Sequence, residues 1–367
     1  MLKTLPAQDG FSMPGEYAPQ DGVLLVWPVR AGSWGVDPRA AQRVFCEVMR
    51  VCSRSERVFL LADKAHFEEA QKQAGAYATV LEIETNDAWA RDIGPTFVTN
   101  GHEVRGINWR FNAWGGATDG LYTDWAADDA AAETFCRAIG APCYDAGDFV
   151  LEGGSICSDG EGTLLVTEAC LLSAGRNPNL SREQIEQKLK DYLGVQKVLW
   201  LPSGIFHDET NEHVDNVCAF LAPGEVVLAW TDNEQDPQYP LSRADCDYLL
   251  RQTDARGRRL KIHKLPIPDH PVCVTGQDLA NFTFETGEDT LKIGQRLAAS
   301  YVNFYFTNDA ILLPQFGGEN ISSDARAAEI LRRLCPAREI VPIYSRAILL
   351  GGGNIHCITQ QIPKGAR

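Results

Sequence analysis

The sequence predicts an α/β fold built from a repeated unit. Short β-rich runs alternate with helical stretches along the 367 residues, and glycine and proline are scattered between them as turn residues. Three segments also recur at an even step, because Asp92 and Glu152 are 60 residues apart and Glu152 and His213 are 61 apart. This spacing indicates an α/β unit repeated around an axis, with each unit delivering a strand end to one shared centre.

The individual elements follow from local patterns. Strands are expected where apolar and β-branched residues run together, at 23–27, 162–167, 226–230 and 310–313. Helices are expected where apolar residues recur at helical spacing, over 38–54, 64–74, 125–139, 181–193, 242–253 and 323–335. Pro38 suits the first turn of its helix. Ser181 is a candidate N-cap, because Gln184 three residues later completes a capping box.

The composition is typical of a soluble globular protein, with 44% hydrophobic and 23% charged residues. The net charge of −15 opposes binding to nucleic acid or anionic membranes and is compatible with a cationic small substrate. Eleven cysteines without close pairs fit a reducing cytoplasm better than a disulfide framework or a zinc ribbon. Because neither a signal peptide nor an apolar membrane span is visible, a cytoplasmic protein is expected.

The most informative segment lies near the C-terminus, where residues 351–353 are all glycine and Cys357 follows four positions later. A glycine triplet lets the backbone take positive φ angles and approach a ligand closely. Gly352 is therefore a candidate contact for a substrate, with the Cys357 thiol presented at the mouth of the site. The alternative is a glycine-rich strand end with a buried structural thiol.

His213 and Asp215 are two positions apart, so on an extended strand both side chains would point to the same face. Three interpretations remain open from these two residues alone. They form a polar strand end, or a pair of ligands for a divalent ion, or an acid/base histidine beside a substrate-binding carboxylate. Metal binding is the weakest once the whole sequence is considered, because no Cys-x-x-Cys, His-Glu-x-x-His, EF-hand or P-loop motif is present.

Two further segments carry acids beside aromatic or apolar residues. Asp92 follows Trp89 and precedes a turn, so Asp92 can face the centre while Trp89 covers the apolar stem of a substrate, and Trp114 can form a second wall. The simpler alternatives are an ion pair on a loop and tryptophans buried in the core. Glu152 lies in an apolar strand, where a carboxylate needs a partner. If that partner is His213, Glu152 fixes its tautomer and orientation.

Together these residues predict a thiol nucleophile with an acid/base histidine and anionic groups that hold the substrate. At this point a family resemblance is visible. The motifs that carry it are MPGE at 13–16, WARDIGP at 89–95, NWRFNAWGG at 108–116, LEGGS at 151–155, DETNEHVDN at 208–216 and GGGNIHCITQQ at 351–361. They resemble the agmatine deiminase family of the guanidine-modifying pentein superfamily, which is similar to the peptidyl-arginine deiminases.

The resemblance runs from residue 13 to the C-terminus, and it implies one catalytic domain over residues 1–367 with a five-bladed, pseudo-symmetric α/β propeller. It makes Cys357 the nucleophile that attacks the guanidinium carbon and forms an amidino-cysteine intermediate. It makes His213 the group that protonates the departing ammonia and then activates water. It also implies that Asp92 and Asp215 hold the guanidinium by paired hydrogen bonds, and that Glu152 orients His213.

The reaction that this resemblance implies is hydrolysis of agmatine to N-carbamoylputrescine and ammonia, in polyamine and putrescine metabolism, with no cofactor and no metal. The resemblance also implies that the protein forms a homo-oligomer. Three departures from the family pattern are Cys157 in place of a histidine, Ala347 in place of an acid, and the loop after Phe316. The alternatives are a deiminase of another guanidine, such as arginine or peptidyl-arginine, and a non-catalytic polyamine-binding protein.

Overall fold

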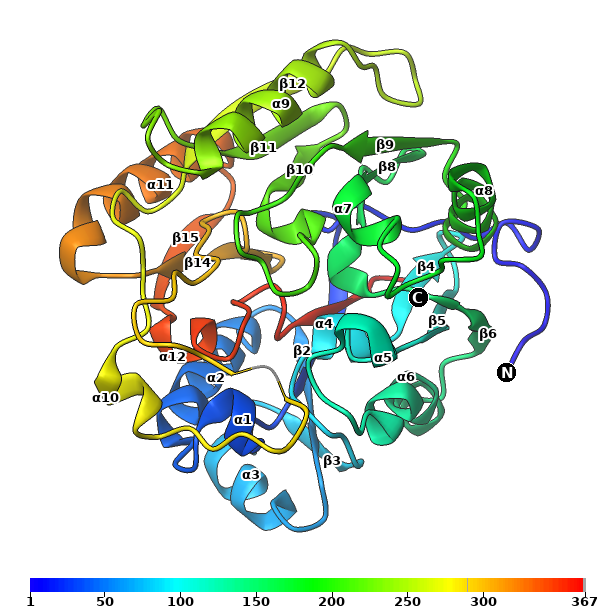
Figure 1. Ribbon diagram of the computed structural model, residues 1–367. Coiled ribbons are helices and arrows are strands. Elements are labelled where there is room, and N and C mark those ends of the chain that lie inside the picture. The colour runs from blue at the N-terminus through cyan, green and yellow to red at the C-terminus, as the bar shows by residue number, and fades with distance from the viewer. Residues whose placement is uncertain (289, 366–367) are drawn as a thin grey trace.

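The computed structural model describes residues 1–288 and 290–365, and its strands form five sheets that follow one another around the centre of the molecule (Figure 1). Four sheets have three strands: β4-β5-β6 (Thr96–Thr99, Val104–Arg110, Cys143–Val150), β7-β8-β9 (Cys157–Ser158, Thr163–Thr167, Lys197–Leu201), β10-β11-β12 (Cys218–Ala222, Glu225–Trp230, Lys261–Pro266) and β13-β14-β15 (Tyr305–Phe306, Ala310–Gln315, Glu339–Tyr344). The fifth has the order β16-β1-β2-β3 (Gln360–Pro363, Gln20–Val26, Arg57–Ala62, Thr79–Glu82).

One strand pattern is repeated in all five sheets. The first two strands are antiparallel and the next strand is parallel to the second. A parallel neighbour requires a crossover connection, and a helix supplies it in each unit. These five crossover helices are α2 (Arg39–Cys52), α6 (Ala126–Ile139), α8 (Arg182–Leu193), α9 (Gln238–Leu250) and α11 (Ile321–Leu334). The predicted repetition of an α/β unit is therefore confirmed.

The remaining helices are short or belong to connections. They are α1 (Ala31–Trp34), α3 (Phe67–Ala74), α4 (Ala90–Ile93), α5 (Gly116–Asp119), α7 (Glu168–Leu171), α10 (Gly276–Leu279) and α12 (Arg346–Leu349). Three single 3₁₀ turns are η1 (Gly153–Ser155), η2 (Val214–Asn216) and η3 (Gly318–Asn320). Among the described residues, no helix is long and apolar enough to cross a membrane.

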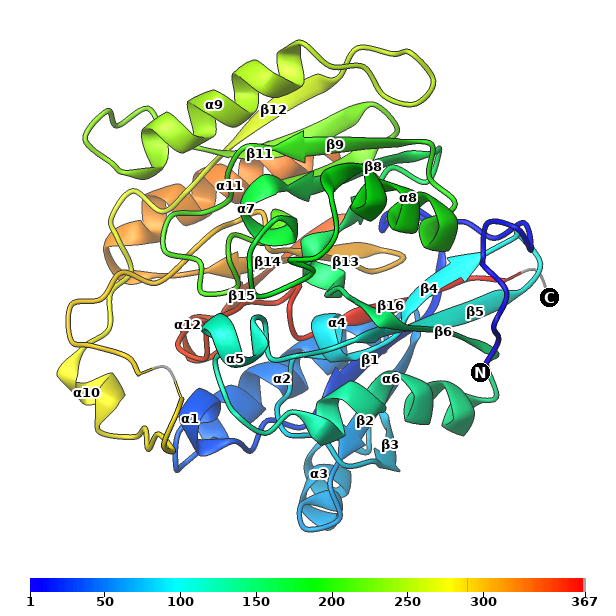
Figure 2. The same cartoon turned by 45° about the vertical axis from the view of Figure 1, so that its right-hand side comes forward.

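The two ends of the chain close the ring of sheets. The C-terminal strand β16 pairs antiparallel with β1, from Gln20 opposite Pro363 to Leu24 opposite Gln360 (Figure 2). Because Cys357 lies three residues before β16, this pairing fixes the position of the segment that carries the thiol. In Figure 1 the same segment, coloured red, crosses the centre of the molecule.

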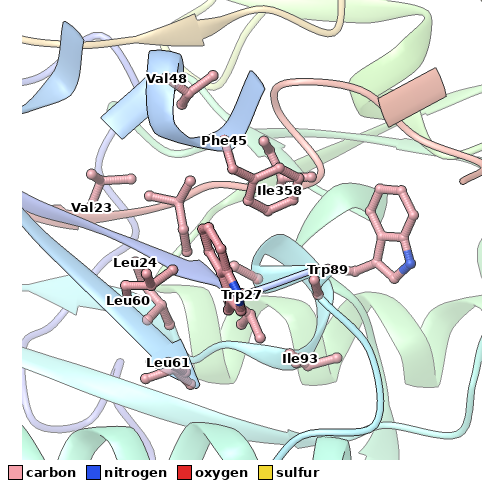
Figure 3. Close-up of a cluster of buried hydrophobic side chains, with 14 of the residues drawn as sticks. Val23, Leu24, Trp27, Phe45, Val48, Leu60, Leu61, Trp89, Ile93 and Ile358 are labelled. Atoms are coloured by element: carbon pink, nitrogen blue, oxygen red, sulfur yellow. The ribbon is translucent and has the colours of Figure 1, made fainter. Parts of the chain in front are cut away.

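An apolar cluster supports this central segment from one side (Figure 3). Helix α2 contributes Phe45 and Val48, which are three positions apart on one face and have no solvent-exposed surface. Burial of each such side chain stabilises the fold by about 1.5–3 kcal/mol. Trp89 and Ile358 belong to the same cluster, so the packing that stabilises the fold also positions the neighbours of the predicted site residues.

Most predicted elements are confirmed, although some ends were wrong. All four predicted strands are present, and Ser181 and Gln184 form the expected capping box at α8. Helix α9 begins at Gln238, four residues before the predicted start, because the Asp236 carboxylate accepts from the Gln238 N–H at the new helix end. Helix α3 begins only at Phe67, since Asp63 first closes a turn by accepting from the N–H of His66.

Candidate functional site

Polar side chains converge at the centre from the turns that precede the first strand of each sheet. Asp92 lies in α4 before β4, and Glu152 lies beside η1 before β7. His213 and Asp215 lie at η2 before β10, and Cys357 lies before β16. A Cβ atom added to Gly154 would lie within 3.0 Å of three of these side chains, at Nδ1 of His213, Oδ2 of Asp215 and Oδ1 of Asp92. The even step in the sequence therefore marks equivalent turns of successive sheets.

Two predictions about local structure were wrong. His213 and Asp215 are not on an extended strand, because Asp215 lies within η2 and His213 precedes it. Glu152 is not inside a strand, because β6 ends at Val150 and Glu152 leads into η1. In both segments the polar groups approach the centre from a tight turn, where their backbone has left the sheet. The predicted convergence of the side chains is nevertheless present.

A cavity opens onto this centre. Several predicted site residues line it, namely Trp89, Asp92, Trp114, Gly352 and Cys357. Other lining residues come from the loops around the mouth, among them Arg30, Asp87, Tyr122, Glu209, Phe284 and Glu288. His213, Glu152 and Asp215 are almost fully buried behind the cavity wall. The thiol is therefore the reactive group nearest to solvent, and His213, Glu152 and Asp215 lie deeper.

The Cys357 thiol is surrounded by polar groups. Its sulfur lies 3.6 Å from Oδ2 of Asp215 and 3.2 Å from Nδ2 of Asn303. Burial, followed by the negative charges of Asp215 and Asp92, raises the pKa of the Cys357 thiol well above its ordinary value. The cysteine is therefore protonated at neutral pH as long as no cation offsets these carboxylates.

The glycine triplet has a steric role. Gly352 has a φ of +106°, a conformation that side chains with a Cβ rarely adopt. A Cβ added to Gly353 would lie 2.6 Å from the ring of Trp89 and 2.9 Å from Cβ of Cys357. A larger residue at position 353 would displace either the tryptophan or the thiol. The triplet thus lets the backbone turn tightly between the cavity wall and Cys357.

Asp92 is held by hydrogen bonds to both of its oxygens. Oδ2 accepts from the indole N–H of Trp114 at 2.9 Å, and Oδ1 accepts from the Gly154 N–H at 2.8 Å. Burial raises the pKa of Asp92 even though the neighbouring His213 lowers it. Trp114 therefore orients this carboxylate in addition to lining the cavity.

His213 lies between carboxylates. Its Nδ1 is 3.9 Å from Oδ2 of Asp92, and its Nε2 is 3.7 Å from Oε2 of Glu152. Burial alone would lower the pKa of His213, but the charge of Asp92 outweighs this effect and the pKa is raised well above its ordinary value. The imidazole is therefore positively charged at neutral pH and can act as a proton donor.

Glu152 has a second partner, Arg176, which the sequence did not indicate. Nε of Arg176 lies 2.8 Å from Oε1 of Glu152, and both side chains are fully buried. Burial raises the pKa of Glu152, but the Arg176 charge outweighs it, so the pKa is lowered. The anionic form of Glu152 beside His213 is thus maintained by a buried cation.

Arg176 also joins the two loops that border the cavity. Its guanidinium donates to the backbone oxygen of Trp114 in one loop and, at 2.8 Å, to that of Thr210 in the other. Among the described residues, the non-glycine positions with positive φ all lie in or beside these loops, at Ala113, Trp114, His207, Asn211 and Glu212. Backbone of this kind persists only where its surroundings fix it, and Arg176 supplies part of that constraint.

A second buried histidine lies directly before the thiol. Nδ1 of His356 is 2.8 Å from Oδ2 of Asp215, and Nε2 is 2.9 Å from Glu16. Glu16 also pairs with Arg91 at 3.4 Å. Although burial raises the pKa of Glu16, the charges of His356 and Arg91 lower it to about 2. The N-terminal segment thus supplies an anion that holds His356, and through it Asp215, in place.

Comparison with known proteins agrees with this arrangement. A model of the Porphyromonas-type peptidyl-arginine deiminase family matches residues 12–363. The chain belongs to this family. It is 58% identical to a protein of Selenomonas ruminantium named as an inferred agmatine deiminase, over 99% of both chains. A solved structure of an agmatine deiminase of Enterococcus faecalis is 45% identical, with a TM-score of 0.96 over 100% of this chain and 99% of that one.

A more distant relative of the same kind has been solved with its substrate. The agmatine deiminase of C. jejuni, as a cysteine-to-serine variant with substrate bound, is 26% identical to this chain. The two superpose with a TM-score of 0.82 over 97% of each chain. The deiminase fold of this chain is therefore α/β with mixed helices and strands, as the sequence predicted.

Among the residues that the structure describes, one group of side chains could hold a metal ion. The ligand atoms of Glu152, Cys170 and His213 lie within 4.8 Å of one another, and all three residues are buried. The Arg176 guanidinium already supplies a positive charge to Glu152, so a divalent cation there would meet electrostatic repulsion. Asp215, which the sequence allowed as a metal ligand beside His213, is not part of this group.

Four residues of the site were not predicted from the sequence: Asn303, Arg176, His356 and Glu16. His356 stands inside a quoted motif, and its position directly before the thiol is the signal that could have found it. Asn303 occupies the turn before β13. Because 90 residues separate it from His213, the spacing of about 60 residues does not predict its position. For Arg176 the only signal was indirect, since a carboxylate beside apolar residues such as Glu152 needs a partner of some kind.

Proposed function

We propose that this chain is an agmatine deiminase, which hydrolyses agmatine to N-carbamoylputrescine and ammonia through a covalent amidino-cysteine intermediate. The observation that carries the proposal is the position of Cys357, which lines a cavity and whose sulfur lies beside two buried carboxylates, Asp92 in the same lining and Asp215 behind it. A planar guanidinium is the cation that paired carboxylates bind best, through charge-assisted hydrogen bonds. The close relatives named as agmatine deiminases support the same activity.

Substrate binding activates the nucleophile. A guanidinium held by Asp92 and Asp215 neutralises the charges that keep Cys357 protonated, so the thiol loses its proton to solvent. The thiolate then attacks the guanidinium carbon and forms a carbon–sulfur bond, giving a neutral tetrahedral intermediate. Orientation of the substrate by two fixed carboxylates lowers the entropic part of this barrier.

His213 transfers the protons of the following steps. As an imidazolium it protonates one amino group of the tetrahedral intermediate, and the carbon–nitrogen bond breaks to release ammonia and the amidino-cysteine. The neutral imidazole then takes a proton from the attacking water. The second tetrahedral intermediate expels the Cys357 thiolate, and loss of the hydroxyl proton leaves N-carbamoylputrescine. Glu152, fixed by Arg176, orients His213 through both steps.

The walls of the cavity support agmatine over arginine. Arginine carries a carboxylate that needs a cation, and among the described residues of the lining the one lysine or arginine is Arg30. This guanidinium is paired with Glu288 and lies over the ring of Tyr122 at 4.5 Å. Asp87 and Glu209 add negative charge to the same lining. A terminal ammonium group suits these walls better than a carboxylate, and Trp89 can cover the carbon chain between the two cationic ends.

We also propose that the chain acts as a single catalytic domain. This is supported by the site itself, whose residues come from turns of all five sheets, so that removal of any one sheet with its preceding turn would remove a site residue. A cytoplasmic location is supported by the eleven cysteines, all of which are free. The proposal also includes that the protein forms a homo-oligomer and that the reaction requires neither a metal ion nor a cofactor.

The test is an assay with two substrates after treatment of the protein with EDTA. Purified protein is incubated with agmatine and, separately, with arginine, and ammonia and ureido products are quantified by mass spectrometry. The proposal predicts N-carbamoylputrescine from agmatine alone. Citrulline from arginine would move the enzyme to another guanidine, and the absence of product from both would leave a polyamine-binding protein. Loss of activity to EDTA would contradict the proposed metal independence.

A further inference from the structure

Four buried side chains, two acidic and two basic in alternation, form a row that leads away from the site. Oδ2 of Asp215 lies 2.8 Å from Nδ1 of His356, and Nε2 of His356 lies 2.9 Å from Glu16, which pairs with Arg91 at 3.4 Å. All four side chains are almost fully buried. His356, Glu16 and Arg91 are not part of the cavity lining, so their effect on a bound substrate must pass through Asp215.

The contacts of His356 determine its charge. Burial and the Arg91 charge lower the pKa of His356, but Glu16 and Asp215 outweigh them, so the pKa is raised. Because the pKa of Glu16 is about 2, this carboxylate is ionised at neutral pH and can only accept, so Nε2 of His356 carries a proton. A second proton on Nδ1, shared with the Asp215 carboxylate, makes the ring an imidazolium. The positive charge of His356 therefore depends on Glu16.

Glu16 is held in place by the segment around it. The backbone oxygen of Met13 accepts from the Ser158 hydroxyl at 2.9 Å, and the backbone oxygen of Glu16 accepts from the Gln20 amide at 2.9 Å. These two contacts fix the N-terminal segment to β7 and to the start of β1. The anion that His356 needs is thus supplied by a segment far from it in sequence and outside the cavity.

Two other titratable side chains lie beside the row, and both are neutral. Burial is the main cause of the raised pKa of the Cys157 thiol and of the Tyr305 hydroxyl, and the charge of Glu16 adds to the effect in both. Both groups keep their protons near neutral pH, so they do not exchange a proton with His356.

We propose that Glu16 and His356 are a pair of positioning residues: the Glu16 carboxylate keeps His356 as an imidazolium, and the imidazolium fixes Asp215 beside the Cys357 thiol. The kinetic role of this pair rests on the proposed deiminase function. A charge-assisted hydrogen bond holds one oxygen of Asp215, so the carboxylate meets the guanidinium in one orientation. The imidazolium offsets the Asp215 charge only in part, because that charge, after burial, still raises the pKa of the thiol. The substrate cation supplies the rest.

The test removes the anion and keeps the size of its side chain. In Glu16→Gln the pKa of His356 should fall, so the imidazolium should be lost as the pH rises. Alkylation of Cys357 by iodoacetamide, followed by mass spectrometry of the peptide that carries it, and kcat with agmatine are measured from about pH 6 to pH 9. Thermal unfolding of each variant reports structural damage separately.

At the low end of this range Glu16→Gln should match the wild-type protein. As the pH rises, alkylation and kcat should fall below the wild-type values, by about tenfold for each unit by which the thiol pKa rises. KM should not rise, because Asp215 keeps its charge. A loss of this kind that grows with pH is not expected from structural damage alone. A wild-type pH profile in Glu16→Gln would overturn the proposal.

Three further variants sharpen the result. Glu16→Asp keeps the anion and should restore most of the wild-type profile. Glu225→Gln is the matched control, because Glu225 also pairs with a histidine, His263 at 2.6 Å, but lies away from the cavity, and its profile should be that of the wild type. In a His356→Asn background, Glu16→Gln should add no change, since Glu16 acts through His356. An additional change of full size in that background would contradict the pairing.

The charge of His356 can also be tested without any variant. Nitrogen-15 spectra of the histidine-labelled wild-type protein should show both ring nitrogens of His356 protonated at neutral pH, and a neutral ring would overturn the proposal even if the variants do not fold. Absence of turnover in the wild-type protein would instead contradict the deiminase function. The alkylation profiles and the ring spectra would then still test the pair.

Discussion

Cys357 and His213 share a buried carboxylate neighbour, Asp92, and the consequences for the two side chains are opposite. Asp92 helps to raise the pKa of both groups. For His213 the higher pKa favours the charged imidazolium, which is the form needed as an acid. For Cys357 it favours the neutral thiol, which is the unreactive form. The free enzyme therefore has its proton donor ready and its nucleophile inactive.

The difference between the two groups shows that the site without a substrate lacks a positive charge beside the thiol. A cation placed between Asp92, Asp215 and the sulfur would lower the pKa of the thiol, because it offsets both carboxylates. The same cation is the substrate of the proposed reaction, so the nucleophile becomes reactive when there is something to attack. Each of the following changes removes one part of this arrangement, in order of expected effect.

Removal of the sulfur should have the largest effect. Cys357→Ser should reduce turnover by a factor on the order of 10⁴ or more, as expected when a covalent nucleophile is lost. Agmatine binding should be nearly unchanged, since Asp92 and Asp215 remain. The measurements are product formation by mass spectrometry and substrate affinity by calorimetry. Normal turnover would remove Cys357 from the mechanism.

Loss of the cation behind Glu152 should act on stability as well as catalysis. Arg176→Gln leaves a buried carboxylate without its partner, so the free energy of unfolding should fall by about 3–5 kcal/mol. The pKa of Glu152, which Arg176 lowers, should rise, so that the acid limb of the kcat profile moves to higher pH. Denaturant unfolding and a pH series of kcat test both parts.

Arg258→Gln serves as the control for this variant. Arg258 also pairs with carboxylates, those of Asp254 and Glu161, but it is exposed at the surface. Its replacement should change stability much less and should not move the pH profile. Equal losses of stability in the two variants would show that the burial of the Arg176–Glu152 pair carries no special weight.

Neutralisation of Asp92 should have opposite effects on substrate turnover and on the reactivity of the free thiol. In Asp92→Asn the guanidinium loses a buried anionic partner. The resulting loss of transition-state stabilisation should be about 2–5 kcal/mol, measured as a decrease in kcat/KM. The free thiol should nevertheless become easier to ionise, so alkylation of Cys357 by iodoacetamide should accelerate. Asp215→Asn should likewise accelerate alkylation of the thiol and lower kcat/KM. An unchanged kcat/KM in either variant would exclude that aspartate from substrate binding.

The smallest effect is expected from the group that orients Asp92. Trp114→Phe keeps an aromatic wall but removes the N–H that donates to Asp92 at 2.9 Å, at a cost of about 1.5–3 kcal/mol in kcat/KM. The pKa of Asp92 is already raised, and loss of this donor raises it further. Since the substrate needs the ionised carboxylate, the acid limb of kcat/KM should move to higher pH. A limb at the wild-type position would contradict this role.

Much of the site could be predicted from the sequence because three of its turns are evenly spaced. Asp92, Glu152 and His213 mark successive units, and the motif around Cys357 is distinctive, so their convergence was expected and is observed. The strand assignments of Glu152 and His213 were wrong because polar residues next to apolar runs resemble strand ends, whereas here the chain has already turned.

The remaining site residues could not be predicted because their contacts are tertiary. The even spacing stops at the fourth sheet, where 90 residues separate His213 from Asn303. Arg176 lies in a connection after α7, and only the fold brings its guanidinium to Glu152. Glu16 reaches His356 across 340 positions of sequence, through the pairing of the two chain ends. Single polar residues of this kind carry no periodic signal.

The most direct test of the central claim compares two alkylating reagents of the same size, 2-chloroacetamidine, which is a cation, and 2-chloroacetamide, which is neutral. The ratio of their rates at Cys357 near pH 7 is measured relative to the same ratio for a free thiol in solution. If the carboxylates keep the thiol protonated until a cation arrives, the relative ratio should exceed about tenfold, the effect of one pKa unit, and should fall in Asp92→Asn. A ratio equal to that of the free thiol would contradict activation of Cys357 by a bound cation.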